Sequence, residues 1–224
     1  MVRFILNGAE VRAAEGRTLL AYLREEARLT GAKNACGEVT CGACSVILDG
    51  ALRTSCTLPI ERVEGRTVLT VEGIPEEEMT LYVRAFAEAG AVQCGFCTPG
   101  MVLAAKALLD RTPDPSPSEA RTALRRNLCR CTGYAKIVDA VMLAARFRRG
   151  ENSPAATRTA GAARTRDFEV GARMPRVEAE AKIRGTASFV DDLAEPGMLH
   201  GAVLRSPYPR ARLLSVDVSA ARAL

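Results

Sequence analysis

The sequence has few aromatic residues and no tryptophan. Aromatic residues make up 4% of the 224 residues while hydrophobic residues make up 48%, so we expect cores built from Ala, Val and Leu. No apolar run approaches the roughly 18 residues that a membrane-spanning helix needs, which predicts that the chain has no membrane span. The first eight residues lack a basic stretch followed by a long apolar core, so we expect no secretory signal.

Histidine is also scarce, and so are runs of residues that carry charge of the same sign. His200 is the only imidazole, and a single imidazole without carboxylate ligands nearby is a poor metal site, so we expect a structural strand residue there. The net charge is +5, but the Arg residues that carry it are spread among Asp and Glu. No aromatic run accompanies them, so the charge indicates a solvated surface and predicts no nucleic-acid partner.

The chain does contain eight cysteines, which fall into two groups of four with none left over. The first group reads C-x4-C-x2-C-x11-C and the second C-x2-C-x31-C-x-C. Four thiolates ligate one [2Fe–2S] cluster, and the first triplet has the plant-type ferredoxin spacing. The sequence therefore predicts two clusters about one electron hop apart, on Cys36, Cys41, Cys44 and Cys56 and on Cys94, Cys97, Cys129 and Cys131.

Three other arrangements of eight cysteines compete with this prediction. Four disulfides are arithmetically possible, but a chain of 224 residues without a visible secretory signal does not need such cross-links. Structural zinc usually joins two short C-x2-C pairs, whereas here three cysteines share one loop and the second group ends in C-x-C. Buried free thiols are common singly, but they do not explain two complete quartets.

Glycines accompany the cysteines in all three loops. A cluster with its thiolates is anionic and needs backbone N–H groups directed at its sulfurs, and glycine lets the backbone wrap closely around it. Helices that begin just after Cys97 and Cys131 would add partial positive charge. The glycines concerned are Gly37, Gly42, Gly95, Gly100 and Gly133.

The first part of the chain has the pattern of strands with one helix. Asn-Gly and Asp-Gly pairs favour two-residue turns between strands, and Thr is a good helix cap. The expected elements are hairpins at 2–13 and 45–54, a helix at 19–29 capped by Thr18, and a strand at 68–71. They predict an α+β fold that begins with a β-grasp, ferredoxin-like [2Fe–2S] domain over residues 1–76.

The rest of the chain divides into three segments. Apolar residues with helical period predict helices at 79–89, 99–110, 118–127 and 135–147, and hence a four-helix-bundle [2Fe–2S] domain over residues 77–150. Residues 151–174 have the Ala-, Thr-, Arg- and Gly-rich composition of a linker. Residues 175–224 predict a partial α/β segment, with strands at 187–190, 199–204 and 216–218.

With these residues in hand, the chain resembles the iron–sulfur portion of the molybdenum hydroxylases, the xanthine oxidase and aldehyde oxidoreductase family. Residues 36–44 with Cys56 resemble the family's first-cluster loop, and residues 93–100 (QCGFCTPG) and 127–134 (NLCRCTGY) are close to two further signatures. Residues 175–207 resemble the opening of the family's molybdopterin-binding subunit, which in family members continues much further. Either the sequence is a fragment or another chain completes that fold.

The resemblance implies an electron-transfer subunit of a multi-subunit molybdenum hydroxylase. Electrons would pass from a molybdopterin centre through the Cys94 quartet and then the Cys36 quartet, with Gln93 and Cys131 lying against the pterin. No flavin domain separates the helical domain from the last segment, so FAD is expected on a separate subunit. The implied partners are a molybdopterin-binding large subunit and an FAD-binding medium subunit in a hetero-oligomer, and the residues that would select substrate are not on this chain.

Two other functions compete with this interpretation. The first is a free-standing two-cluster ferredoxin-like electron carrier, against which the segment after residue 174 argues, and the second is a structural zinc protein. Reduced thiols and cluster insertion favour the cytoplasm as the compartment.

Overall fold

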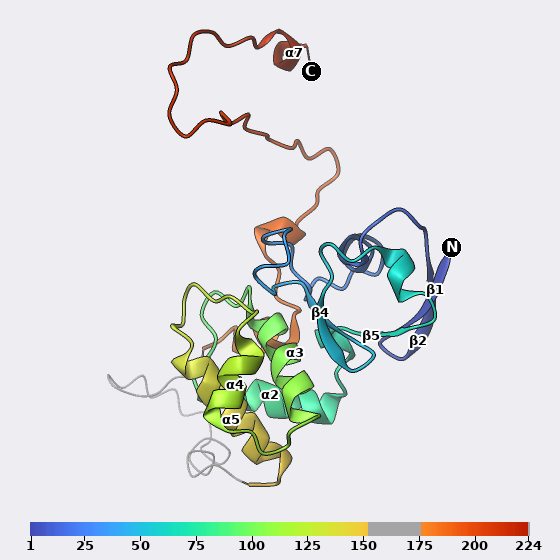
Figure 1. The fold of residues 1–224 in the computed structure, drawn as a ribbon, viewed down its shortest axis with the longest axis vertical. Helices are drawn as coiled ribbons and strands as arrows, with labels where there is room; N and C mark the ends of the chain where they lie inside the picture. Colours follow the sequence, from blue (N-terminus) through green and yellow to red (C-terminus); the bar gives the residue numbers. More distant parts are fainter. Residues whose placement is uncertain (152–175, 224) are drawn as a thin grey trace. The chain divides into compact units, whose positions relative to one another are not determined.

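In a computed structural model, residues 1–151 and 176–223 are described, and the linker expected at 151–174 lies almost wholly outside them (Figure 1). The chain divides into two units, Met1–Val190 and Asp191–Leu224. The elements of the first unit are β1 (Val2–Leu6), β2 (Ala9–Ala13), α1 (Leu19–Ala21), η1 (Tyr22–Glu26), β3 (Ser45–Leu48), β4 (Ala51–Thr54), η2 (Ile60–Val63), β5 (Thr67–Leu69), η3 (Val71–Gly73), α2 (Glu76–Glu88), α3 (Thr98–Leu109), α4 (Pro117–Leu124), α5 (Ala135–Arg148) and α6 (Ala179–Arg184).

The strands form one mixed sheet in the order β2-β1-β5-β3-β4. β1 pairs with β5 in parallel, and the other pairs are antiparallel. Both expected hairpins are confirmed, and the turn residues Asn7, Gly8, Asp49 and Gly50 all have positive φ, as a tight turn between twisted strands requires. The inner face of the sheet is covered by a core that includes Phe4, Leu19 and Leu23.

The predictions for the remaining elements of this part are less accurate. Thr18 caps the helix as expected, because its hydroxyl accepts a hydrogen bond from Ala21 N at 3.2 Å. However, only Leu19–Ala21 is α-helical, and the chain continues as a π-helix to Glu26 instead of an α-helix to Leu29. The expected strand at 68–71 is wrong at its end, since β5 is Thr67–Leu69 and Val71 begins a 3₁₀ turn.

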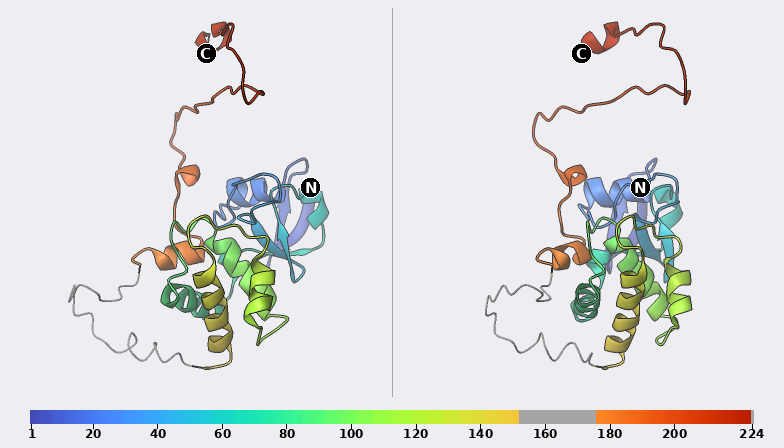
Figure 2. Two further views of the ribbon diagram at one scale, coloured as in Figure 1. Left: turned by 60° about the vertical axis from the view of Figure 1, so that its left-hand side comes forward. Right: turned by 90° about the vertical axis from the view of Figure 1, so that its left-hand side faces the viewer.

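The four expected helices are present with shifted ends. Pro99 lies in the first turn of α3, where its missing N–H costs nothing. Ser116 and Glu119 form a reciprocal capping box at the start of α4, which begins the helix one residue earlier than expected. α2 packs along α5, and α4 packs on α3 and α5 beside the sheet (Figure 2). Their shared core is built mainly of Ala, Val and Leu, as the composition predicts.

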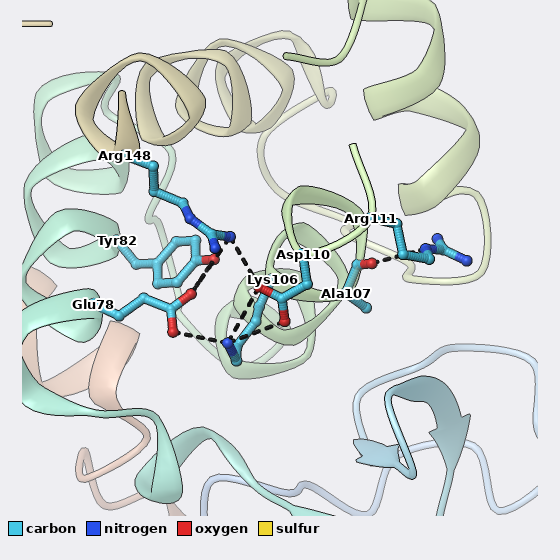
Figure 3. Close-up of polar contacts among 7 residues, drawn as sticks. All are labelled: Glu78, Tyr82, Lys106, Ala107, Asp110, Arg111 and Arg148. Carbon is cyan, nitrogen blue, oxygen red and sulfur yellow. Dashed lines mark hydrogen bonds and ion pairs between the residues drawn. The ribbon is translucent and has the colours of Figure 1, made fainter. Parts of the chain in front are cut away.

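A partly buried network of charges joins three of these helices (Figure 3). Glu78 of α2 lies 2.7 Å from Lys106 of α3, and its other oxygen accepts a hydrogen bond from the Tyr82 hydroxyl at 3.1 Å. Arg148 of α5 lies 3.0 Å from Asp110 at the end of α3 and 3.6 Å from Glu78. Two acids and two bases therefore balance, and burial followed by the Glu78 charge raises the pKa of Tyr82 well above its usual range.

The sheet part and the helical part share Ile47 of β3 in one core, and beside it they meet at a close contact between backbones. A Cβ on Gly100 in α3 would lie 2.5 Å from the carbonyl oxygen of Gly42, and one on Gly42 would lie 2.4 Å from that of Arg126. The buried Asn127 side chain fills the adjacent space, donating to Gly42 O at 3.1 Å and to Ser45 Oγ at 3.2 Å. We call Gly42, Gly100 and Asn127 the junction.

The segment after the linker does not form the expected strands. The strands predicted at 187–190, 199–204 and 216–218 are wrong, since residues 176–190 contribute α6 to the first unit and the described part of the second unit contains short helical turns, η5 (Val190–Asp192) and α7 (Ser219–Arg222). His200, expected in a strand, is exposed in irregular chain. Strands need a pairing partner, and residues 191–223 provide no sheet to join.

Among residues 1–151 and 176–223, no helix is long and apolar enough to cross a membrane.

The charge network predicts that Glu78→Gln destabilises the chain. The change leaves Lys106 and Arg148 with one carboxylate between them in a half-buried setting, so we expect a loss of about 1.5–3 kcal/mol in the free energy of unfolding. Urea unfolding followed by circular dichroism measures it. Glu77→Gln is the matched control, because Glu77 is an exposed residue of the same helical turn and its loss should cost less than about 0.5 kcal/mol.

The junction predicts that Gly100→Ala is destabilising, although Gly→Ala within a helix normally stabilises by up to about 1 kcal/mol. The added methyl group would meet a backbone oxygen that cannot move alone, so we expect a loss of about 1–3 kcal/mol in unfolding experiments. Gly201→Ala is the control, since nothing lies within 4 Å of its added Cβ. A gain of stability in Gly100→Ala would contradict the close contact.

Candidate metal centres

The first cysteine quartet lies around the β3–β4 hairpin. Cys36 and Cys41 lie in the loop after η1, Cys44 directly precedes β3, and Cys56 follows β4. The thiols approach in pairs: Cys36 is hydrogen-bonded to Cys41, and Cys44 to Cys56. Gly37 and Gly42 both have positive φ, so the loop between them turns in a way that most side chains disfavour.

Hydrogen bonds and burial give the thiols of this quartet different pKa values. The Thr40 hydroxyl and the Glu38 N–H, whose nitrogen lies 3.4 Å from the sulfur, lower the pKa of Cys36 to about 6. Burial raises the pKa of Cys44 to about 11, with Cys56 as its hydrogen-bonding partner. One side of the quartet is therefore solvated and supplied with donors, while the other lies in the core of the sheet part.

The second quartet is assembled from two interhelical loops. Cys94 and Cys97 lie between α2 and α3, and Cys129 and Cys131 lie between α4 and α5. The Sγ atoms of Cys94 and Cys131 are 3.6 Å apart, and Cys97 is hydrogen-bonded to Cys129. The four thiols again approach as two pairs, although Cys94 and Cys131 lie 37 residues apart in the chain.

The cysteines of the second quartet also differ in burial and in their hydrogen bonds. Burial, followed by the neighbouring Cys129, raises the pKa of Cys97 well above its usual range. Burial also acts on Cys129, but hydrogen bonds from the hydroxyl and backbone of Thr132 outweigh it and lower the pKa; the hydroxyl oxygen lies 3.1 Å from the sulfur. Cys94 and Cys131 are exposed at the protein surface.

The donor sets fit a two-iron cluster. Each iron of a [2Fe–2S] cluster takes two thiolates, so a quartet arranged as two pairs matches its requirement. Within the described residues no three His, Cys, Asp or Glu side chains converge closely enough to hold a single metal ion. The residues that could hold the two clusters are the two quartets of free cysteines, Cys36, Cys41, Cys44 and Cys56 and Cys94, Cys97, Cys129 and Cys131.

A direct hydrogen bond connects the two cysteine loops. Leu128 N–H donates to the carbonyl oxygen of Cys41 at 2.8 Å, and Leu128 is bonded to Cys129. A cysteine of one quartet is thus one hydrogen bond and one residue away from a cysteine of the other. The junction residues Gly42 and Asn127, which directly precede or follow these residues in sequence, hold this contact in place.

Gln93 lies where the sequence places it, beside the exposed end of the second quartet. Its side chain is exposed, next to the exposed Cys94. Cys131 reaches the same place through its contact with Cys94. The structure therefore brings Gln93 and Cys131 to one surface.

Two residues near the sites were not singled out by the sequence interpretation. Tyr134, at φ 70° before α5, accepts a hydrogen bond from Cys129 N at 2.9 Å and donates to Asn127 O at 3.3 Å, so it fixes the C-x-C turn. The sequence feature that could have indicated Tyr134 is its position directly after Thr132-Gly133 in the 127–134 motif. Lys182 of α6 packs on Gly95, and no local sequence pattern could have indicated that contact.

Two family models match the chain over most of the cysteine-bearing part. Residues 4–70 match the 2Fe-2S iron-sulfur cluster binding domain, and residues 70–142 match the [2Fe-2S] binding domain. The nicotinate dehydrogenase small FeS subunit of Eubacterium barkeri is 50% identical over 142 residues, which cover 62% of this chain and 90% of the relative. The aldehyde oxidoreductase of Megalodesulfovibrio gigas is 38% identical over 225 residues, covering 96% of this chain and 25% of the relative.

Solved structures agree with these matches. The aldehyde oxidoreductase from Desulfovibrio desulfuricans superposes with a TM-score of 0.76 at 38% identity, covering 85% of this chain and 22% of that one. Two [2Fe–2S] domain matches, a small-subunit relative matched over most of its length and the aldehyde oxidoreductase fold lead to one conclusion: the chain belongs to the iron–sulfur electron-transfer subunits of the molybdenum hydroxylase family.

Proposed function

We propose that this chain conducts electrons between a molybdopterin-bearing partner and a flavin subunit or other acceptor, by way of two [2Fe–2S] clusters. When bound, each cluster supplies reversible one-electron transfer. The chain's own residues hold the two sites, set their spacing and exclude water from their inner sides. The proposal assigns one cluster to Cys36, Cys41, Cys44 and Cys56 and the other to Cys94, Cys97, Cys129 and Cys131.

The contact between the cysteine loops carries the proposal. The Leu128–Cys41 hydrogen bond of 2.8 Å gives a short bonded route from Cys129 to Cys41. A protein that used its quartets only to stabilise separate domains would need no such contact. Asn127, which precedes Leu128, is buried and donates a hydrogen bond to Ser45 Oγ, which supports the position of this route.

The exposure of the quartets supports a direction. Cys94, Cys131 and the neighbouring Gln93 lie at the surface, so this end suits a pterin held by a partner chain. Residues 37–40 of the first loop are exposed as well, and they offer a second surface for an acceptor. We propose that electrons enter at the second quartet and leave at the first.

The partners and architecture follow the same interpretation. We propose a hetero-oligomer in the cytoplasm, with a molybdopterin-binding large subunit and an FAD-binding medium subunit. The mixed sheet with one crossing helix supports a β-grasp domain over residues 1–76, and α2–α5 support a four-helix bundle over 77–150. Residues 151–174 would be the linker, and 175–224 the opening of a molybdopterin-binding domain.

Iron and acid-labile sulfide analysis tests the cluster assignment. Two [2Fe–2S] clusters predict about four irons and four sulfides per chain of anaerobically purified protein. A chain that contained zinc and no sulfide would be a structural zinc protein, and the proposal would be wrong. Native copurification then distinguishes a subunit, which should migrate with a pterin-bearing partner, from the alternative of a free-standing electron carrier.

Single cysteine variants test the independence of the two sites. Cys131→Ser removes a ligand at the exposed end of the second quartet and should halve the iron and sulfide content. It should abolish one electron paramagnetic resonance signal of the reduced protein and retain the other. Cys44→Ser is the reciprocal variant and should abolish the signal that Cys131→Ser retains. Loss of both signals in each variant would contradict two separate sites.

A further inference from the structure

The segment that follows the linker folds onto the iron–sulfur part of the chain. We call residues 179–189 the strap; it comprises α6, Gly185 and the residues up to Phe189. Ala179 and Ile183 are buried in the same core as α2 and α3, and Ile183 is 0% exposed. Full burial of an Ile side chain contributes about 1.5–3 kcal/mol, so the strap is an integral part of this unit.

The strap touches both the helical part and the sheet part. Arg184 forms a two-pronged ion pair with Glu76 at the start of α2, at 2.8 and 2.7 Å. Gly185 has φ 80° and approaches the loop before the first cysteines so closely that a Cβ would lie 2.8 Å from Gly31 Cα. The Gly185 turn therefore brings the strap across from one part to the other.

Lys182 covers the loop between Cys94 and Cys97. A Cβ on Gly95 would lie 2.6 Å from Cγ and Cδ of Lys182, so the aliphatic stem rests directly on the glycine. The Lys182 side chain is only 11% exposed. Its ammonium group lies 2.6 Å from a Glu178 carboxylate oxygen and 3.5 Å from the carbonyl oxygen of Gln93.

The end of the strap covers the same loop from the other side of Gly95. The Phe189 ring meets Phe96 edge to face at 5.4 Å between centroids. The ammonium group of the buried Lys33 lies 4.7 Å from the centre of the Phe189 ring. Residues 93–96 are thus held by Lys182 and Phe189, both of which come from beyond the linker.

We propose that the strap fixes the Gln93–Phe96 loop of the second cluster site and that Lys182 is its positioning residue. Lys182 fixes the Gln93–Gly95 backbone that presents Cys94, and it places a cation beside the site, whose effect Glu178 moderates. This inference rests on the proposed two-cluster function. It assigns to a segment outside the two cluster-binding domains a role in setting one cluster's reduction potential.

The physical reason is electrostatic. Reduction adds negative charge to a cluster, so a nearby cation stabilises the reduced form and raises the reduction potential. A charge that is nearly excluded from water is screened less than one on the surface. The Lys182 side chain as a whole is 11% exposed, whereas Glu178 is 63% exposed and is screened more strongly by water, so it neutralises the lysine only in part.

Redox titration of the full chain with its clusters, followed by electron paramagnetic resonance, tests the proposal. Lys182→Met retains the stem and removes the charge, and it should lower the potential of the cluster that Cys131→Ser abolishes. Glu178→Gln removes the moderating carboxylate and should shift the same potential upward. Lys182→Arg should stay near the wild-type value. The potential of the Cys36-quartet cluster should not move in any of them.

Arg184→Gln is the matched control. It also removes one positive charge from α6, but Arg184 contacts α2 and not the cysteine loop. It should leave both potentials unchanged. Equal shifts in Lys182→Met and Arg184→Gln, or none in Lys182→Met, would overturn the proposal. Lys182→Met could also lose the second cluster outright, and sulfide analysis then decides. Half-normal sulfide in Lys182→Met with full sulfide in Arg184→Gln supports the positioning role of Lys182. Half-normal sulfide in both variants refutes that role. A wild-type chain without sulfide would instead refute the proposed function itself.

Discussion

The arrangement of the whole iron–sulfur part depends on a contact between backbones that only glycine permits. Gly42 and Gly100 meet with no room for a methyl group between them, and the buried Asn127 amide completes the contact. Because the interior of a protein is close-packed, a displacement there would propagate to both cysteine loops. The Leu128–Cys41 hydrogen bond lies beside this contact and depends on it.

The two quartets share a design despite their different scaffolds. In each, the thiols approach as two pairs, and the cysteines of one quartet differ in exposure: Cys44 is buried in the first, and Cys94 and Cys131 are exposed in the second. In the sheet part a hairpin supplies the rigidity, while in the helical part it comes from α3, α5 and the Tyr134 hydroxyl, which binds the C-x-C turn.

Local signals in the sequence predicted most of the fold. The Asn7-Gly8 and Asp49-Gly50 turns located both hairpins to the residue, because positive φ at two adjacent positions leaves few alternatives. The helices were located by the period of their apolar residues. The errors lie at the helix ends, whose positions are set by capping residues. Both quartets were predicted from their spacing, and the contact pairs within them needed the structure.

What the sequence did not indicate depends on contacts between distant segments. The π-helical turn at Tyr22–Glu26 carries no pattern that distinguishes it from an α-helix. The β-like residues at 187–190, 199–204 and 216–218 form no strands, since a strand needs a pairing partner and they pair with none of the described residues. The packing of Lys182 on Gly95 joins positions on either side of the linker, and no local sequence pattern connects the two.

The packing of Phe189 on Phe96 also affects how a following domain finds its place. Because the chain is continuous, any segment that continues after Val190 starts one residue after Phe189, whose ring packs edge to face on Phe96 in the cysteine loop. A domain attached there is held at a high effective concentration near the exposed cysteines, and its docking becomes an intramolecular event.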